Sequence, residues 1–222
     1  DYKESFCNYL FYQPKELWQY EAALFCCDRN EIKAYMLRRL KPGLGGGKTI
    51  FVTVDEVASA HIKELAAVYP VLNADKAKDA DMRFCRFIEG VFDKRIVSSV
   101  FLTGEGFENN WYPTSLRVLC NGRRAFIGNN LYSKGACYTA YRKMFMHIED
   151  PVYLSEDKLT DQISVNMRVN GQEMWYPIVS WGSHWYESNN QWEVLLEDTE
   201  DIELHIESLV QGTLKTCLLY TS

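Results

Sequence analysis

The residues best suited to hold a ligand follow the short apolar run Val100–Leu102. Gly104 and Gly106 lack a Cβ, so a bound group can approach the backbone N–H groups of this turn closely, and either glycine can adopt a positive φ. Glu105 offers a carboxylate as a hydrogen-bond acceptor, and Phe107 offers an aromatic face for stacking. A plain strand-to-helix turn, with Phe107 buried, is the alternative interpretation.

Regular elements on both sides are expected to position this turn. Apolar residues at three- and four-residue spacing predict an amphipathic helix over residues 75–93, which leads into the strand before the turn. Three elements are expected after it, namely a helix at Leu116–Leu119, a strand at Ala125–Ile127 and a helix that begins near Leu131. Strand, glycine turn, helix, strand and a helix with small residues is the order of one lobe of a nucleotide-binding fold.

The chain before this lobe-like stretch predicts three strands. The runs Glu21–Cys27 and Glu31–Leu40 are separated by the turn residues Asp28-Arg29-Asn30 and predict a β-hairpin, with a helix over the second run as the alternative. The β-branched run Thr49–Val54 predicts a third strand, and apolar spacing then predicts a helix over Asp55–Tyr69.

Gly47-Lys48-Thr49 invites comparison with a phosphate-binding P-loop. That motif needs glycine at position 42, where Pro42 stands, and it must begin a helix, whereas Thr49 begins a strand-like run. A flexible glycine turn between strands is the better interpretation.

The last third of the chain predicts an all-β module. Asn170-Gly171 lies between two alternating runs and is the strongest hairpin signal in the chain. A second hairpin is expected around Ser188–Gln191, and Asp201–Val210 alternates as a half-buried strand does. Four tryptophans could line an exposed peptide groove, although packing between sheets is favoured for most of them: Trp175, Trp181, Trp185 and Trp192.

Composition bounds the classes of partner. The 222-residue chain has a formal net charge of -6, which argues against a nucleic-acid partner, since that needs a basic face. No stretch approaches the roughly 20 apolar residues of a membrane span, so no membrane partner is expected. The seven cysteines show no metal-ligand spacing and indicate reduced thiols in a cytoplasmic protein. Cys26 and Cys27 lie on an apolar run with no histidine nearby, which favours packing over nucleophilic chemistry.

The order of elements resembles the second ATPase lobe of the actin-like superfamily, especially the DnaK-type (seventy-kilodalton heat-shock) chaperones, and its kin are expected in a bacterial family of chaperone-like proteins. The resemblance covers residues 20–143. Ser99–Phe107 is similar to the adenosine motif of that family, and Lys134–Ala140 is similar to the small-residue helix that packs where the two lobes meet. The implied fold is α/β, of the actin-like or ribonuclease-H-like type, followed by a smaller all-β module.

The resemblance also implies a cofactor, ATP or ADP with magnesium. Gly104, Glu105, Gly106 and Phe107 would contact it, Glu105 through a ribose hydroxyl and Phe107 by stacking on the base. Gly135 is a further candidate contact, although it and its neighbour Ala136 are better explained by close packing against a neighbouring element.

One departure from the family weakens the catalytic part of this expectation. The phosphate loop of this lobe lies between its first two strands and contains several glycines, whereas Phe25–Glu31 contains none. Asp28 could still help to hold magnesium, but a turn aspartate needs no such role. ATP hydrolysis needs two lobes around the metal and phosphates. With the first lobe absent from this sequence, no catalytic residue is assigned and this chain alone is not expected to be an enzyme.

The expected domains are an ATPase lobe over residues 1–148, a β-rich interaction module over 149–214, and a non-native tail over 215–222. The tail resembles translated adaptor sequence, and both ends look cut. The leading hypothesis is a nucleotide-responsive, chaperone-like protein whose partners are the first lobe and a peptide or protein bound by the β module. A pseudo-ATPase that serves as a binding or scaffold module is the alternative. A sugar-kinase-like enzyme is a third reading, without a sugar-binding signature.

Overall fold

Two compact units make up the chain. The computed structural model describes residues 2–40, 49–67, 73–145, 151–188, 191–196 and 201–220. Unit 1 comprises Asp1–Arg39 and Thr53–Glu149, and unit 2 comprises Leu40–Val52 and Asp150–Ser222. Unit 1 combines a mixed sheet with helices, and unit 2 contains an antiparallel sheet, so the expected sequence of an α/β part followed by an all-β module is confirmed at this level.

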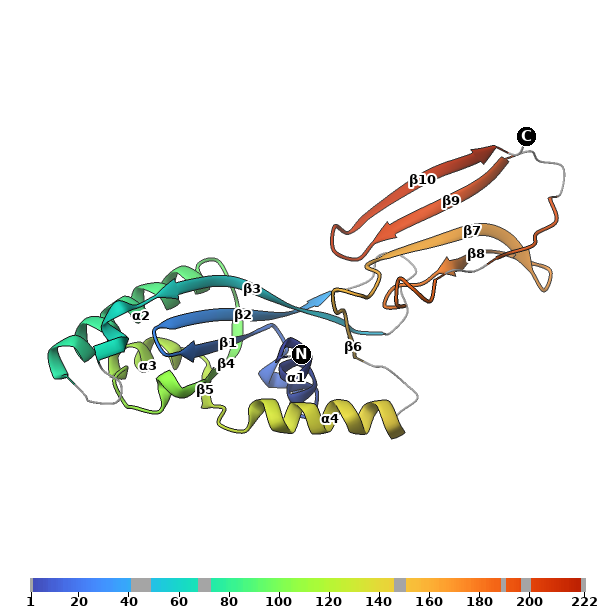
Figure 1. The fold of residues 1–222 in the computed structure, drawn as a ribbon. Coiled ribbons are helices and arrows are strands. Elements are labelled where there is room, and N and C mark those ends of the chain that lie inside the picture. Colours follow the sequence, from blue (N-terminus) through green and yellow to red (C-terminus); the bar gives the residue numbers. More distant parts are fainter. Residues whose placement is uncertain are drawn as a thin grey trace. The chain divides into compact units, whose positions relative to one another are not determined.

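The larger sheet has the strand order β5-β4-β1-β2-β3-β6 (Figure 1). Its strands that lie wholly or mainly in unit 1 are β1 (Glu21–Asp28), β2 (Glu31–Leu40), β3 (Phe51–His61), β4 (Val97–Thr103) and β5 (Arg124–Ile127). β1 is antiparallel to β2 and parallel to β4, which is in turn parallel to β5. The predicted hairpin is thereby confirmed, and the alternative of a helix over Glu31–Leu40 is wrong.

The helix predicted over Asp55–Tyr69 is wrong as well. β3 continues as far as His61, and only the short 3-10 helix η2 (Lys63–Ala67) follows within the described residues. The backbone of β3 is hydrogen-bonded to its neighbour β2, and Val57 and Ala58 pack against the core. These long-range interactions outweigh a helical pattern that local spacing alone suggests.

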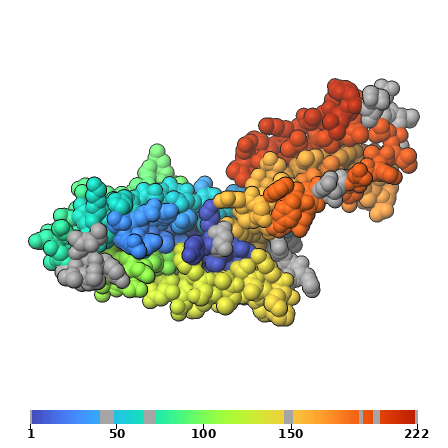
Figure 2. All heavy atoms as spheres, in the orientation of Figure 1, coloured from blue at the N-terminus to red at the C-terminus, as the bar shows by residue number. Residues whose placement is uncertain are grey.

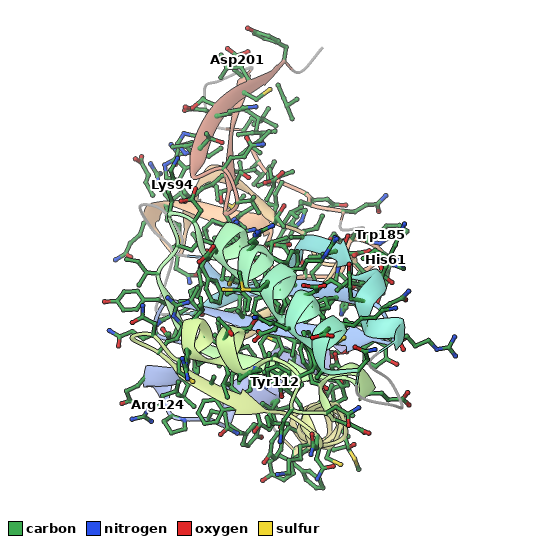
Figure 3. All side chains as sticks on the ribbon, turned by 90° about the vertical axis from the view of Figure 1, so that its left-hand side faces the viewer. His61, Lys94, Tyr112, Arg124, Trp185 and Asp201 are labelled. Carbon is green, nitrogen blue, oxygen red and sulfur yellow. The ribbon has the colours of Figure 1, made fainter. Side chains whose placement is uncertain are left out.

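One face of the unit 1 sheet is covered by α2 (Ala74–Phe92) and α3 (Pro113–Leu119). Figure 3 looks onto α2 in front of the strands. The fully buried Phe84 of α2 packs edge-to-face on Phe25 of β1. Val100 and Leu102 of β4 belong to the same core cluster. The helix predicted over residues 75–93 and the strand at Val100–Leu102 are therefore confirmed.

The other face carries α1 (Tyr2–Phe11) and α4 (Leu131–Phe145), which lie side by side (Figures 1 and 2). Phe101 points to this face because neighbouring strand residues alternate in direction, and its ring contacts Phe6 of α1 and Phe126 of β5. A Cβ at Gly135 of α4 would overlap the backbone carbonyl of Ser5. The close approach of α1 and α4 therefore requires glycine at position 135, in agreement with the favoured interpretation of Gly135 as a close-packing residue.

Gly135→Ala is expected to destabilise unit 1 by about 1–3 kcal/mol, because the added methyl group must push α1 away from α4. The urea midpoint, followed through amide exchange in β1 and β4, measures this cost. The matched control is Gly90→Ala on α2, where a Cβ meets nothing within 4 Å. That variant should gain about 0.5–1 kcal/mol, since alanine favours a helix over glycine. Equal effects of the two changes would contradict tight packing at Gly135.

Unit 2 holds a four-stranded antiparallel sheet in the order β10-β9-β7-β8. Its elements are β6 (Val152–Tyr153), β7 (Asp161–Val169), β8 (Gln172–Val179), β9 (Asp201–Ser208) and β10 (Thr213–Tyr220). β6 pairs in parallel with Phe51 and Val52. Asn170 and Gly171 both have positive φ, 52° and 82°, as a tight turn between antiparallel strands requires, so this predicted hairpin is confirmed.

Two predictions for unit 2 had different outcomes. Residues 185–188 and 191–196 form no strands, so the second predicted hairpin is wrong as far as the described residues show; residues 189 and 190 lie outside them. Residues 213–220, which include most of the expected non-native tail, form β10 against β9. Strand pairing uses backbone groups that any sequence supplies. The pairing of β10 with β9 therefore does not test whether residues 215–222 are native, and their non-native origin stays a prediction.

In the described part of the chain, no helix combines the length and the apolar character needed to cross a membrane. The P-loop comparison falls almost entirely on residues 41–48, which lie outside the described residues.

Candidate functional site

The carboxyl edge of the unit 1 sheet is the natural place for a ligand. β1, β4 and β5 are mutually parallel, so their carboxyl ends meet at one edge, where ligands bind in open α/β sheets. Three connections leave this edge, namely the β1–β2 turn, the turn from β4 through the 3-10 helix η3 (Glu105–Phe107), and Gly128-Asn129-Asn130 before α4. Four of the five candidate contact residues lie in the second connection.

Cys27 of β1 closes the inner side of the glycine turn. A Cβ at Gly104 would overlap the carbonyl oxygen of Cys27, and a Cβ at Gly106 would overlap its Sγ. Gly104 also has φ 101° and ψ 154°, a conformation that is essentially restricted to glycine. Both glycines are therefore required by the approach of β1 to this turn, and no ligand is needed to explain them.

Phe107 is a core residue. Its side chain is 3% exposed, and its ring contacts Phe84, Trp111 and Tyr112. The expected stacking of Phe107 on a nucleotide base does not fit this burial. The alternative stated for it, a buried side chain after a strand-to-helix turn, is what the structure contains.

The carbonyl groups of the turn are bound by the same aromatic cluster. The indole nitrogen of Trp111 donates a hydrogen bond of 2.6 Å to the carbonyl oxygen of Gly106. The hydroxyl of Tyr112, labelled in Figure 3, donates one of 3.2 Å to the carbonyl oxygen of Phe107. Since buried hydrogen bonds of this kind fix a backbone, the turn is held rigidly against α2 and α3. Glu105 is exposed.

The β1–β2 turn offers little to a phosphate group. Asp28 pairs with Glu31 at the end of the ladder, so only Arg29 and Asn30 form the turn, and Arg29 takes the positive φ of 53°. A two-residue turn without glycine presents no extended row of N–H groups. Among the residues that the structure describes, no three histidine, cysteine or carboxylate side chains are grouped to hold a metal ion.

Gly135 does not join the other candidate residues. It faces Ser5 of α1, on the sheet face opposite to the core that holds Phe107. The candidate residues thus divide into a turn packed on Cys27 and a helix packed on α1.

A polar cluster that sequence reasoning missed lies next to the edge. A side-chain hydrogen bond joins Cys26 to Tyr132 of α4, and another joins Tyr35 of β2 to Glu56 of β3. Burial is the main cause that raises the pKa of the Cys26 thiol, and burial likewise raises the pKa of Tyr132. Burial also raises the pKa of Cys27 to about 12. Both thiols stay protonated at neutral pH, which suits packing and not nucleophilic attack. The alternation of side chains along a strand predicts that Cys26 and Cys27 face opposite sides of the sheet. No local sequence pattern identifies the residues that each of them contacts.

Comparisons with known proteins assign both parts of the chain. The model of a family described as "Family of unknown function (DUF5716) C-terminal" matches residues 1–156. The model described as "Domain of unknown function (DUF8552)" matches residues 158–219. No curated protein matches the chain.

Proposed function

Because the chain belongs to the DUF5716 family, whose function is unknown, its own geometry must suggest the function, and we propose a pseudo-ATPase that serves as a binding or scaffold module. In this proposal unit 1 is a lobe of the actin-like type that no longer responds to a nucleotide, and unit 2 binds a peptide or protein. A single observation carries it. Cys27 fills the space beside Gly104 and Gly106 that an adenosine motif would leave to its ligand.

The order of elements supports the actin-like part of the proposal. The antiparallel β1–β2 hairpin and its neighbour β3 are followed by α2, the parallel strand β4, α3, the parallel strand β5 and α4. This is the order on which the resemblance to the second lobe of DnaK-type chaperones rests. The missing first lobe of such a clamp is then a partner of this chain, contributed by another part of the protein or another molecule.

Two further features favour the loss of nucleotide binding. The β1–β2 turn has no glycine where the family places its phosphate loop. Phe107 is committed to the core and has hydrophobic neighbours that a rotation toward a base would have to abandon. Exposing a side chain of this size costs about 1.5–3 kcal/mol before any stacking is gained.

The nucleotide-responsive protein remains the second candidate. It is favoured by the position of Gly104 and the exposed Glu105 at the carboxyl edge of parallel strands. In that case ATP or ADP with magnesium would bind between this lobe and a first lobe, with Glu105 at the ribose.

Calorimetric titration of the full-length protein with ATP and magnesium, repeated with ADP, separates the two candidates. If the protein is a pseudo-ATPase, the titration should give no saturable heat of binding even at high protein concentration. A saturating isotherm with one nucleotide per chain would overturn it. Loss of binding in a Gly104→Val variant would not identify the site by itself, because valine at this position also disrupts the packing on Cys27.

A further inference from the structure

Several apolar residues of the unit 2 sheet gather on one face. Paired residues in an antiparallel sheet point to the same side. The register therefore places the following residues together: Ile163 and Val165 of β7, Leu204 and Ile206 of β9, and Met174 and Tyr176 of β8. The opposite face carries Glu203, His205 and Glu207 of β9, and with them Trp175 of β8 and Leu214 and Leu218 of β10. The first set is the more uniformly apolar side of the sheet, and we call it the apolar face; Lys215 of β10, which pairs with Ile206, lies on the same side.

This apolar face is only half covered. Among the six residues that define it, Val165 alone is buried, at 9% exposure, while Met174 is 47% exposed. A sheet normally buries its apolar face against a second layer. The described residues of unit 2 supply no such layer of strands or helices. An apolar sheet face in this condition is suited to a partner.

The segment Trp192–Leu196 extends the apolar surface. The Trp192 ring contacts the ring of Tyr176 at 5.5 Å between centroids, which ties the segment to the apolar face. Val194, Leu195 and Leu196 are nevertheless 45%, 97% and 43% exposed. Three consecutive exposed apolar side chains next to a half-covered sheet face form one surface that can bury apolar groups of a partner.

Charge identifies the kind of partner. Residues 158–219 contain ten acidic and three basic residues, which gives a formal net charge of -7, while the whole chain has -6. The negative charge of the chain therefore lies in this module. Glu193 stands within the apolar segment itself and is exposed. A second copy of the module would bring two such charges together, whereas a cationic partner is attracted.

Resting on the proposed role of unit 2 as a binding module, we propose that the apolar face and Trp192–Leu196 bind a basic amphipathic segment of another protein, in which lysine or arginine alternates with apolar residues. Its apolar side chains would cover Met174, Tyr176 and Leu195. Its cations would be attracted by the net negative charge of the module and would face Glu193. Alternation at every second residue matches the period of a strand laid on a sheet.

Fluorescence anisotropy with the full chain and a labelled peptide of alternating lysine and leucine tests this proposal. Two comparison peptides replace either the lysines by glutamate or the leucines by serine. The lysine–leucine peptide should bind about tenfold more tightly than either, a difference worth about 1.4 kcal/mol, and its affinity should fall as salt is added. Equal affinity of the lysine–leucine and glutamate–leucine peptides would overturn the proposal.

Leu195→Ser should lower the affinity for the lysine–leucine peptide by about fivefold or more, because Leu195 is the most exposed side chain of the segment. Glu193→Lys should weaken it similarly and reduce the salt dependence. Ile96→Ser is the control, since Ile96 is 67% exposed but belongs to unit 1. It should leave the affinity unchanged.

Analytical sedimentation of the same variants tests the main alternative, in which a second copy of the chain occupies the apolar face. A dimer that forms without peptide and dissociates in Leu195→Ser would assign the face to a second copy and overturn the proposal. The peptide results are independent of the nucleotide titration. Nucleotide binding with intact peptide selectivity would overturn only the pseudo-ATPase, and absent peptide binding without nucleotide heat would overturn only the choice of partner.

Discussion

Gly104→Ala should cost unit 1 about 3–5 kcal/mol of unfolding free energy, the largest effect expected of a single added methyl group. Two penalties combine. An alanine at φ 101° and ψ 154° is strained by about 1–3 kcal/mol. Its Cβ also overlaps the backbone carbonyl of Cys27, and overpacking of this kind adds about 1–3 kcal/mol. The backbone of a central strand cannot move aside as the end of a flexible side chain can.

The urea midpoint of unit 1, followed through amide exchange in β1 and β4, measures this loss. Gly122→Ala is the matched control, because Gly122 has φ 71° and its Cβ would meet nothing within 4 Å. It should lose only the strain, about 1 kcal/mol. If Gly104→Ala were as mild as Gly122→Ala, the turn would not be held against Cys27.

Asp81→Ala should destabilise unit 1 by about 3 kcal/mol. Asp81 of α2 is 3% exposed, and its carboxylate accepts hydrogen bonds from the backbone N–H groups of Thr114 and Ser115 at 2.7 and 2.8 Å. The Ser115 hydroxyl lies 2.7 Å from the same carboxylate. The residue before α3, Tyr112, supplies no side-chain cap, so Asp81 caps this helix from α2. Alanine would leave the buried N–H group of Ser115 and the part-buried N–H group of Thr114 without this acceptor.

The same carboxylate makes stability depend on pH. Burial raises the pKa of Asp81, but the hydrogen bonds from Ser115 and Thr114 together outweigh it, so the pKa is lowered overall. A carboxyl group with a lowered pKa in the folded state stabilises the fold above its unfolded pKa of about 3.9. This stabilisation is lost as the pH falls below about 4 and through the folded pKa.

Asp81→Asn separates charge from shape. It should retain the side-chain volume, lose about 1–2 kcal/mol at neutral pH, and remove the contribution of Asp81 to the loss of stability below about pH 4. Denaturant midpoints at a series of pH values measure both quantities. An unchanged pH profile in Asp81→Asn would show that other carboxylates dominate acid unfolding. Asp79, exposed on the same helix, provides the control Asp79→Asn, which should leave the profile as it is.

Sequence reasoning succeeded where a local pattern decides the structure. The β1–β2 hairpin, α2 and the Asn170-Gly171 turn all follow from periodicity and turn chemistry within a few residues. It failed where a distant strand decides. β3 runs past Asp55 because β2 pairs with it, and the residues around Ser188 do not form the second hairpin although turn residues are present.

The candidate site shows the same limit. A glycine required by a ligand and a glycine required by a neighbouring strand look alike in sequence. Gly104 and Cys27 are far apart in the chain, and only the parallel pairing of β1 and β4 brings them together. Phe107 is similarly ambiguous until α2 supplies Phe84 beside it. The approximate position of the glycine turn was predictable from the sequence, but its packing against Cys27 was not.

A double-mutant cycle between Gly106 and Cys27 tests most directly whether Cys27 fills the side of the turn that a ligand would need. Gly106 has no positive φ, so the obstacle to Gly106→Ala is the overlap with Cys27, chiefly with its Sγ. Cys27→Ala removes that atom. We predict that Gly106→Ala costs about 1–3 kcal/mol in the natural chain and at least about 1 kcal/mol less beside Cys27→Ala. Additivity within about 0.5 kcal/mol would contradict the account, because the glycine would then be required by something other than Cys27.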